Sequence, residues 1–289
     1  MERRKNMEVR YFSFSKYHNK RPPTGSTFIR MIQMEKYWSE FKEYTYGENP
    51  DVLIFQKVYC SADYKFPAQF EKKKILDICD PDWLIGNAVK ETVDAVDAIT
   101  CSTNRMKEFI EQMTDKPVVV IPDRFDLSVL PEPKEHISNS KKAVWFGYVH
   151  NAEAIKYGIK ALEENGIELT VISNEDPFAY KWASNENYKE LYTFKKYNEA
   201  TIYDDLKEAD FAFLPALIRP EYEFKSNNRT IKANLVGLPV VYDSASLNEY
   251  SDVKNRKKFV DNHVDEIKVK YDIRNSVEQY KELISEITS

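Results

Sequence analysis

Two cations flank the start of an expected helix in the second half of the chain. Lys225 comes just before this helix and Arg229 about one turn inside it, and Ser226 or Asn227 can cap its first turn. The first backbone amides, around Asn227 and Asn228, and the helix dipole together favour an anion. Two cations and a helix N-terminus suit a diphosphate. The pattern therefore predicts a diphosphate site, although an ordinary capped helix start with two surface cations has the same residues.

A pair of carboxylates follows an expected strand in the first half. Asp80 and Asp82 come after the apolar run 74–78, and open α/β sheets bind ligands at the carboxyl ends of their strands. A carboxylate at this position can bind a substrate hydroxyl or take its proton. We predict that Asp80 is a catalytic carboxylate, while Asp80-Pro81 is also typical of a plain turn.

The sequence predicts neither a metal site nor a bound cofactor. The four histidines and three cysteines show none of the close spacings of a zinc site. The chain contains neither a GxGxxG motif nor a P-loop. We therefore expect neither a resident metal ion nor a bound cofactor.

Composition limits the class of protein and its partners. The 289 residues suggest two domains, and the net charge of −5 argues against nucleic acid as a partner. No apolar run approaches the length of a membrane span, and three scattered cysteines are typical of reduced thiols in a cytoplasmic protein. The basic residues near the N-terminus would allow peripheral contact with the inner face of a membrane, although a plain solvated basic end has the same composition; they are Arg3, Arg4, Lys5, Arg10 and Lys16.

The elements that must position these residues alternate between strand-like and helix-like runs. In the first half we expect strands over residues 8–14, 52–55, 74–78, 98–101 and 118–121, and helices over residues 26–44, 86–93 and 103–113. In the second half we expect strands over residues 143–147, 167–172, 211–215 and 240–242, and helices over residues 152–164, 201–208, 227–235 and 276–287. This alternation is typical of βαβ units and parallel sheets.

The predicted fold class is α/β, with two Rossmann-like domains that face a cleft and parallel sheets flanked by helices. A polar, proline-bearing stretch separates the two halves. We expect an N-terminal Rossmann-like domain over residues 1–133, a linker over 134–142 and a C-terminal Rossmann-like domain over 143–273. Residues 274–289 are expected to form a helix that packs back toward the N-terminal domain.

One segment resembles the donor-binding region of bacterial GT-B glycosyltransferases of the "group 1" superfamily. It runs from Ala233 through Gly237-Leu238-Pro239-Val240-Val241, and a strand that ends in Pro215 precedes it. Four further stretches resemble that family in the right order, namely residues 75–82, 95–103, 118–123 and 144–151. The resemblance covers roughly residues 75–245, and the chain is similar to a short and divergent member.

The resemblance implies transfer of a sugar from a nucleotide-diphosphate sugar to an acceptor hydroxyl, without a metal, on a glycan or lipid-linked surface polymer. In place of a metal, Lys225 and Arg229 would stabilise the departing diphosphate. The resemblance also implies that residues 1–133 form the acceptor-side domain, with Asp80 as the catalytic residue on that side, and that residues 143–273 form the nucleotide-sugar-binding domain. The resemblance also implies contacts with the rest of the donor. A loop from Gly147 to Asn151 would lie near the phosphates, together with Ser226, Asn227 and Asn228 at the helix start. Pro215 would lie near the base, and Glu221 or Glu223 would bind ribose or sugar hydroxyls.

One departure from the family opens other hypotheses. Many retaining members carry two glutamates eight positions apart, and the aligned positions here are Phe224 and Lys232. The chain could therefore be a catalytically degenerate sugar-nucleotide-binding partner subunit. A sugar-nucleotide epimerase and a glycosyltransferase acting on nucleic acid bases are the further alternatives.

Overall fold

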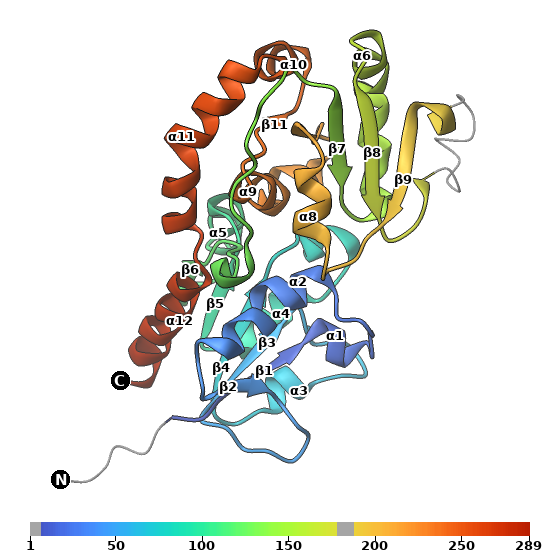
Figure 1. The fold of residues 1–289 in the computed structure, drawn as a ribbon. Helices are drawn as coiled ribbons and strands as arrows, with labels where there is room; N and C mark the ends of the chain where they lie inside the picture. The colour runs from blue at the N-terminus through green and yellow to red at the C-terminus, as the bar shows by residue number, and fades with distance from the viewer. Residues whose placement is uncertain (1–6, 178–187) are drawn as a thin grey trace, which may run out of the picture. The chain divides into compact units, whose positions relative to one another are not determined.

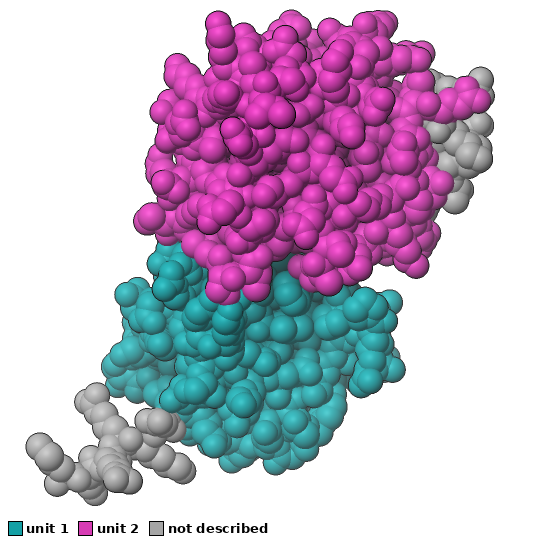
Figure 2. Space-filling view, viewed as in Figure 1, with its two compact units in different colours: residues 1–126, 220–226, 271–289 teal, residues 127–219, 227–270 magenta. Residues whose placement is uncertain are grey.

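The computed structural model describes residues 7–177 and 188–289, and the basic residues Arg3, Arg4 and Lys5 lie outside them. The chain divides into two compact units, which Figure 2 shows in different colours. Unit 1 comprises the chain up to Asp126 together with Pro220–Ser226 and Tyr271–Ser289. Unit 2 comprises Leu127–Arg219 and Asn227–Lys270.

Unit 1 is built on a six-stranded parallel sheet with the strand order β2-β1-β3-β4-β5-β6. Its strands are β1 (Val9–Ser13), β2 (Phe41–Glu43), β3 (Val52–Gln56), β4 (Lys73–Ile78), β5 (Ala98–Cys101) and β6 (Val118–Val120). Its α-helices are α1 (Phe14–Tyr17), α2 (Gly25–Arg30), α3 (Phe66–Gln69), α4 (Val89–Ala95), α5 (Asn104–Ile110) and α12 (Ile273–Thr288), as Figure 1 shows.

Successive residues of these strands enter two different apolar clusters, because side chains alternate across a strand. Leu53 and Phe55 belong to one cluster, whereas Val52 and Ile54 belong to the other. Helix α12 completes the second cluster with one apolar face. Both faces of the sheet are therefore covered at its centre, which explains why β3 and β5 are buried along their whole length.

Unit 2 is built on a five-stranded parallel sheet with the strand order β11-β10-β7-β8-β9. Its strands are β7 (Lys142–Phe146), β8 (Glu168–Ser173), β9 (Tyr192–Lys196), β10 (Phe211–Phe213) and β11 (Val240–Val241). Its described α-helices are α6 (Ile159–Glu164), α8 (Ile202–Lys207), α9 (Asn228–Leu235), α10 (Ser244–Ser251) and α11 (Val253–Lys270).

The stretch before β7 is held firmly within unit 2. Arg256 of α11 is fully buried and donates to the hydroxyl of Ser140 at 2.5 Å and to the carbonyl of Ser138 at 2.5 Å. His136 is also buried, with its ring nitrogen 2.9 Å from the carbonyl oxygen of Gly237. Residues 134–142, expected as a linker, thus carry several hydrogen bonds to the rest of this unit.

Two predicted helices are wrong in their extent. The helix expected over residues 26–44 ends at Arg30, and after a 3-10 turn the chain forms the edge strand β2. The rings of Trp38 and Phe41 stack with centroids 4.9 Å apart, and Phe41 pairs with Val9 of β1. Tertiary pairing has here overridden a helix-like pattern.

The second helix, expected over residues 152–164, is divided into a 3-10 helix, Val149–Tyr157, and α6. The break falls at Gly158, where a Cβ atom would lie 2.7 Å from the ring of Phe213. The backbone must approach β10 closely at this point, and only glycine allows it.

Candidate functional site

The predicted anion site begins at α9, whose N-cap residue is Asn227. The side chain of Asn227 makes no capping hydrogen bond, and the hydroxyl of Ser226 donates instead to Asp123 at 2.5 Å. Neither Ser226 nor Asn227 therefore caps the first turn of α9 with its side chain. Helix α9 is anchored in the core of unit 2 through Ile231, Ala233 and Leu235.

Arg229 lies in the first turn of α9 against the carboxyl end of β7. Its guanidinium is 5.6 Å from the centre of the Trp145 ring, and its Nη1 donates to the carbonyl of Phe146 at 3.3 Å. A Cβ atom on Gly147 would lie 3.1 Å from the same Nη1. The structure thus brings together two predicted donor-site residues, Arg229 and Gly147, at the edge where open α/β sheets bind ligands.

The other predicted donor residues of unit 2 follow neighbouring strand ends. Asn151 belongs to the 3-10 helix that follows β7, and Pro215 follows β10, which pairs with β7. In the same loop, the backbone amide of Val149 donates to the side chain of Asn174 at 3.0 Å. Gly147, Asn151 and Pro215 therefore all follow the carboxyl ends of adjacent strands.

Four predicted site residues belong to unit 1 instead, on the segment Pro220–Ser226. Glu221 and Glu223 lie in a 3-10 helix, and Glu223 forms a solvent-exposed ion pair with Arg105 at 3.6 Å. Lys225 Nζ lies 4.8 Å from the centre of the Tyr222 ring. Lys225 and Ser226 thus belong to unit 1, whereas Arg229 belongs to unit 2.

Phe224 anchors this segment in the core of unit 1. The ring is buried and packs edge-on against Trp83 and Phe109, at centroid distances of 5.2 Å and 5.7 Å. The hydroxyl of Thr103 donates to the Phe224 carbonyl at 3.1 Å. The residue aligned with the first family glutamate is therefore a core side chain.

Lys232, aligned with the second glutamate, is also buried. Its Nζ lies over the rings of Tyr197 and Tyr203, at 5.8 Å and 5.3 Å, and 3.7 Å from the Glu199 carboxylate. Burial lowers the pKa of this lysine more than Glu199 raises it. Lys232 is therefore part of the packing around α9 and presents no carboxylate to a donor.

Asp80 and Asp82 lie after β4, together with Lys57, which directly follows β3. The Lys57 Nζ lies 2.5 Å from Asp80 Oδ2 and 3.5 Å from Asp82 Oδ2, and the Tyr59 hydroxyl donates to Asp82 at 2.7 Å. Burial raises the pKa of Asp80, but the nearby cations, Lys57 above all, lower it by more, so the pKa of Asp80 lies below its usual value. Burial dominates at Asp82 and raises its pKa.

A buried ionic network next to this site was not predicted from the sequence. Arg30 of α2 contacts both Asp77 oxygens, at 2.8 Å and 2.5 Å, and Asp123 at 2.9 Å. Asp123 is also the acceptor of the Ser226 hydroxyl. A carboxylate inside the apolar run of β4 was the available signal, because an ion inside a core strand requires a partner.

The described parts of the chain show no group of three or more histidine, cysteine or acidic residues arranged to hold a metal ion. In residues 7–177 and 188–289, no helix combines the length and apolar character that a membrane crossing needs. All three cysteines are buried and unpaired by disulfides.

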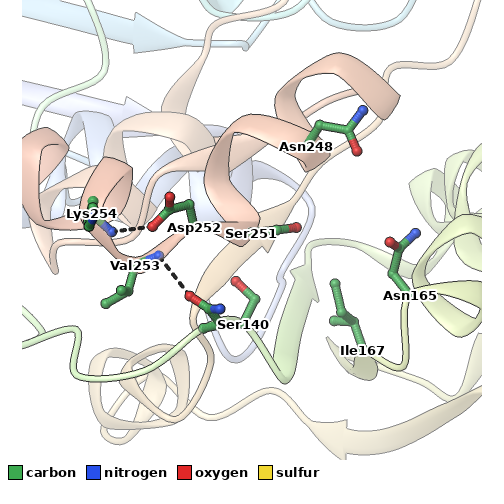
Figure 3. A pocket seen from close by; sticks show the side chains of 9 residues that line it. Ser140, Asn165, Ile167, Asn248, Ser251, Asp252, Val253 and Lys254 are labelled. Carbon is green, nitrogen blue, oxygen red and sulfur yellow. Dashed lines mark hydrogen bonds between the residues drawn. The ribbon is translucent and has the colours of Figure 1, made fainter.

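A hollow of about 530 Å³ lies elsewhere in unit 2 (Figure 3). Its lining includes Ser140 and Ile167, which precede β7 and β8, so it lies at the amino ends of these strands. The Asn139 side chain accepts the amide of Val253, and Asp252 accepts that of Lys254. These groups already bind the start of α11, and none of the predicted site residues lines the hollow.

No family model matches the sequence, and a search of curated proteins finds no match. Solved structures do match. Anabaena HepE in complex with UDP has a TM-score of 0.70 at 10% identity, over 97% of this chain and 100% of that chain. AviGT4, a glycosyltransferase involved in avilamycin A biosynthesis, has a TM-score of 0.63 at 11% identity, over 96% of each chain.

A β-glucosyltransferase that modifies DNA, solved with and without uridine diphosphoglucose, has a TM-score of 0.59 at 11% identity, over 97% of this chain and 99% of that chain. The chain spans only 54% of TarM and 57% of the pneumococcal O-GlcNAc transferase GtfA. Together the two parallel sheets and these matches show that the chain has the GT-B fold, with two Rossmann-like units, as glycosyltransferases such as AviGT4 do.

Proposed function

We propose that this protein transfers a sugar from a nucleotide-diphosphate sugar to an acceptor hydroxyl, with UDP as the nucleotide. The observation that carries the proposal is Arg229, held on Trp145 and beside Gly147 at the carboxyl end of β7. The amides at the start of α9 lie in the same unit and have no side-chain cap. UDP is chosen because HepE and GtfA were solved with it.

The chemistry follows from charge. As the bond from the anomeric carbon to the diphosphate breaks, the leaving group gains negative charge, and fixed cations and amides stabilise it. Arg229 supplies a cation without a metal ion, and Lys225 remains the second predicted cation. Gly147, Asn151 and Pro215 would line the nucleotide, Glu221 or Glu223 would bind sugar hydroxyls, and Asp80 would bind the acceptor.

The acceptor in this proposal is a hydroxyl of a glycan or lipid-linked surface polymer. The net charge of −5 argues against a DNA acceptor. Three unpaired, buried cysteines favour the cytoplasm as the compartment.

The test is calorimetric titration of the full chain with UDP, UDP-sugars, GDP and uridine. We expect UDP to bind and uridine to bind far more weakly, and Arg229→Ala to weaken UDP binding by about 10- to 100-fold, because a hydrogen bond to a charged group contributes about 1.5–3 kcal/mol. Lys254→Ala is the matched control, since it removes an exposed cation next to the hollow at the opposite strand ends. Equal UDP affinity in Arg229→Ala and wild type would refute the donor site.

A second candidate is a sugar-nucleotide-binding partner subunit without catalytic activity. The burial of Phe224 and Lys232 favours it, because neither side chain presents a carboxylate to a donor. Such a subunit would bind UDP and yet release none from UDP-sugars, with or without acceptor glycans. Chromatographic detection of free UDP from a panel of UDP-sugars separates the two functions.

A further inference from the structure

Lys57 occupies an unusual place at the carboxyl edge of the unit 1 sheet. It follows β3 with a φ of 52°, a left-handed conformation that few residues other than glycine adopt. Its side chain is 12% exposed, and its Nζ lies 5.4 Å from the centre of the Phe14 ring. The backbone turn and the ring together direct the ammonium toward the two carboxylates after β4.

The two oxygens of Asp80 are in different situations. Oδ2 binds Lys57 at 2.5 Å, whereas the structure gives Oδ1 no hydrogen-bond partner among the described residues. The Asp80 side chain is 37% exposed, so Oδ1 is open to a hydroxyl group. A carboxylate held by one oxygen and open at the other has the geometry of a general base.

Asp82 has a supporting place in the same cluster. Its side chain is only 7% exposed, and its Oδ2 accepts the Tyr59 hydroxyl. The 3.5 Å contact with Lys57 gives the ammonium a second carboxylate. Asp82 therefore fixes Lys57 from inside the unit, while Asp80 faces outward.

The geometry points to Lys57 as a positioning residue that holds Asp80 by Oδ2, so that Oδ1 takes the proton of the acceptor hydroxyl. This inference rests on the proposed function. The acceptor O–H bond breaks toward Asp80 Oδ1, and the acceptor oxygen bonds to the anomeric carbon. The bond from that carbon to the diphosphate oxygen breaks, and its electron pair leaves with the nucleoside diphosphate.

Charges on several elements face Asp80 and set its pKa. Burial raises it, while Lys57 after β3, Lys225 on the segment 220–226 and Arg30 of α2 lower it. Cys79 and Asp82 lie beside it in the sequence, and Asp80 in turn raises the pKa of each. Because Lys57 is the dominant opposing cation, its removal is expected to raise the pKa of Asp80.

The first experiment measures this pKa directly, without any substrate. Aspartate carboxyls are labelled with ¹³C and titrated by NMR, and the Asp80 signal is assigned from its loss in Asp80→Asn. In Lys57→Met, which keeps most of the length of the side chain but removes its charge, the Asp80 pKa should rise by about 1–3 units. Lys57→Arg should keep it low. Lys65→Met is the control, since it breaks an exposed ion pair with Glu91 elsewhere in unit 1. An unchanged Asp80 pKa in a folded Lys57→Met protein would overturn the inference.

The second experiment measures kcat/KM for UDP-sugar turnover against pH. A base must be ionised to act, so activity falls as pH drops through the Asp80 pKa. In Lys57→Met this acid limb should move to higher pH by the same interval, and Lys57→Arg should restore it. An NMR shift without a shifted limb, or the absence of turnover in wild type, would overturn the proton-accepting role. UDP titration distinguishes that result from failure of the donor site, because UDP binding is assigned to Arg229 of unit 2.

Discussion

The anchoring of the segment 220–226 by Phe224 predicts a large and measurable loss of stability in Phe224→Ala. The ring is 8% exposed and contacts Trp83 and Phe109 inside an apolar cluster. Truncation of a buried phenylalanine to alanine costs about 3–5 kcal/mol. Since a short surface segment can partly relax, we take the lower end, about 3 kcal/mol, for this variant.

Equilibrium unfolding in urea, followed by circular dichroism, measures this loss. Phe224→Leu keeps most of the apolar volume and should cost less than about 1.5 kcal/mol. Ser226→Ala, which removes the hydroxyl donated to Asp123, is a second comparison on the same segment. A loss below about 1 kcal/mol in Phe224→Ala would refute the packing argument.

Measurements of kcat and of UDP binding test the same variant independently of its stability. If Phe224 holds Lys225 in place, Phe224→Ala should lower kcat more than it weakens UDP binding, since Arg229 and Gly147 belong to unit 2. Equal losses in both quantities would instead indicate a general disturbance of the fold.

The remaining predictions concern charge and backbone. Lys225→Ala should lower turnover by about 10²–10³-fold with the urea midpoint unchanged, and near-normal turnover would remove it from the donor site. Arg30→Met leaves Asp77 buried without its cation, so urea unfolding should show a loss of about 3–5 kcal/mol; a loss under 1 kcal/mol would contradict the buried pair. Gly237 has a φ of 84°, and an added Cβ would lie 2.8 Å from the backbone nitrogen of Lys134. Gly237→Ala should therefore cost at least about 2 kcal/mol in the same assay, and wild-type stability would contradict the close approach.

Much of the fold could be predicted from local sequence patterns. Apolar runs such as 52–55 and 98–101 form strands because buried parallel strands need side chains that fill both faces of a sheet. The α/β class and the two parallel sheets are confirmed. Two failures were at segments where a distant partner decides the conformation, namely β2, which pairs with β1, and Gly158, which packs on Phe213. Strand β9 and helix α11 were not predicted.

The candidate site, like the fold, could be predicted only in part from the sequence. Local sequence patterns show which residue types lie near strand ends and helix starts, and from these Asp80, Gly147 and Arg229 were predicted as site residues. Their partners depend on the tertiary structure, because the contacts of Lys57 with Asp80 and of Ser226 with Asp123 join positions 23 and 103 residues apart. The energy of an ion pair or a buried ring depends on what surrounds it in space. No local pattern carries that information, and for this reason Lys57 and the anchoring role of Phe224 emerged only from the folded chain.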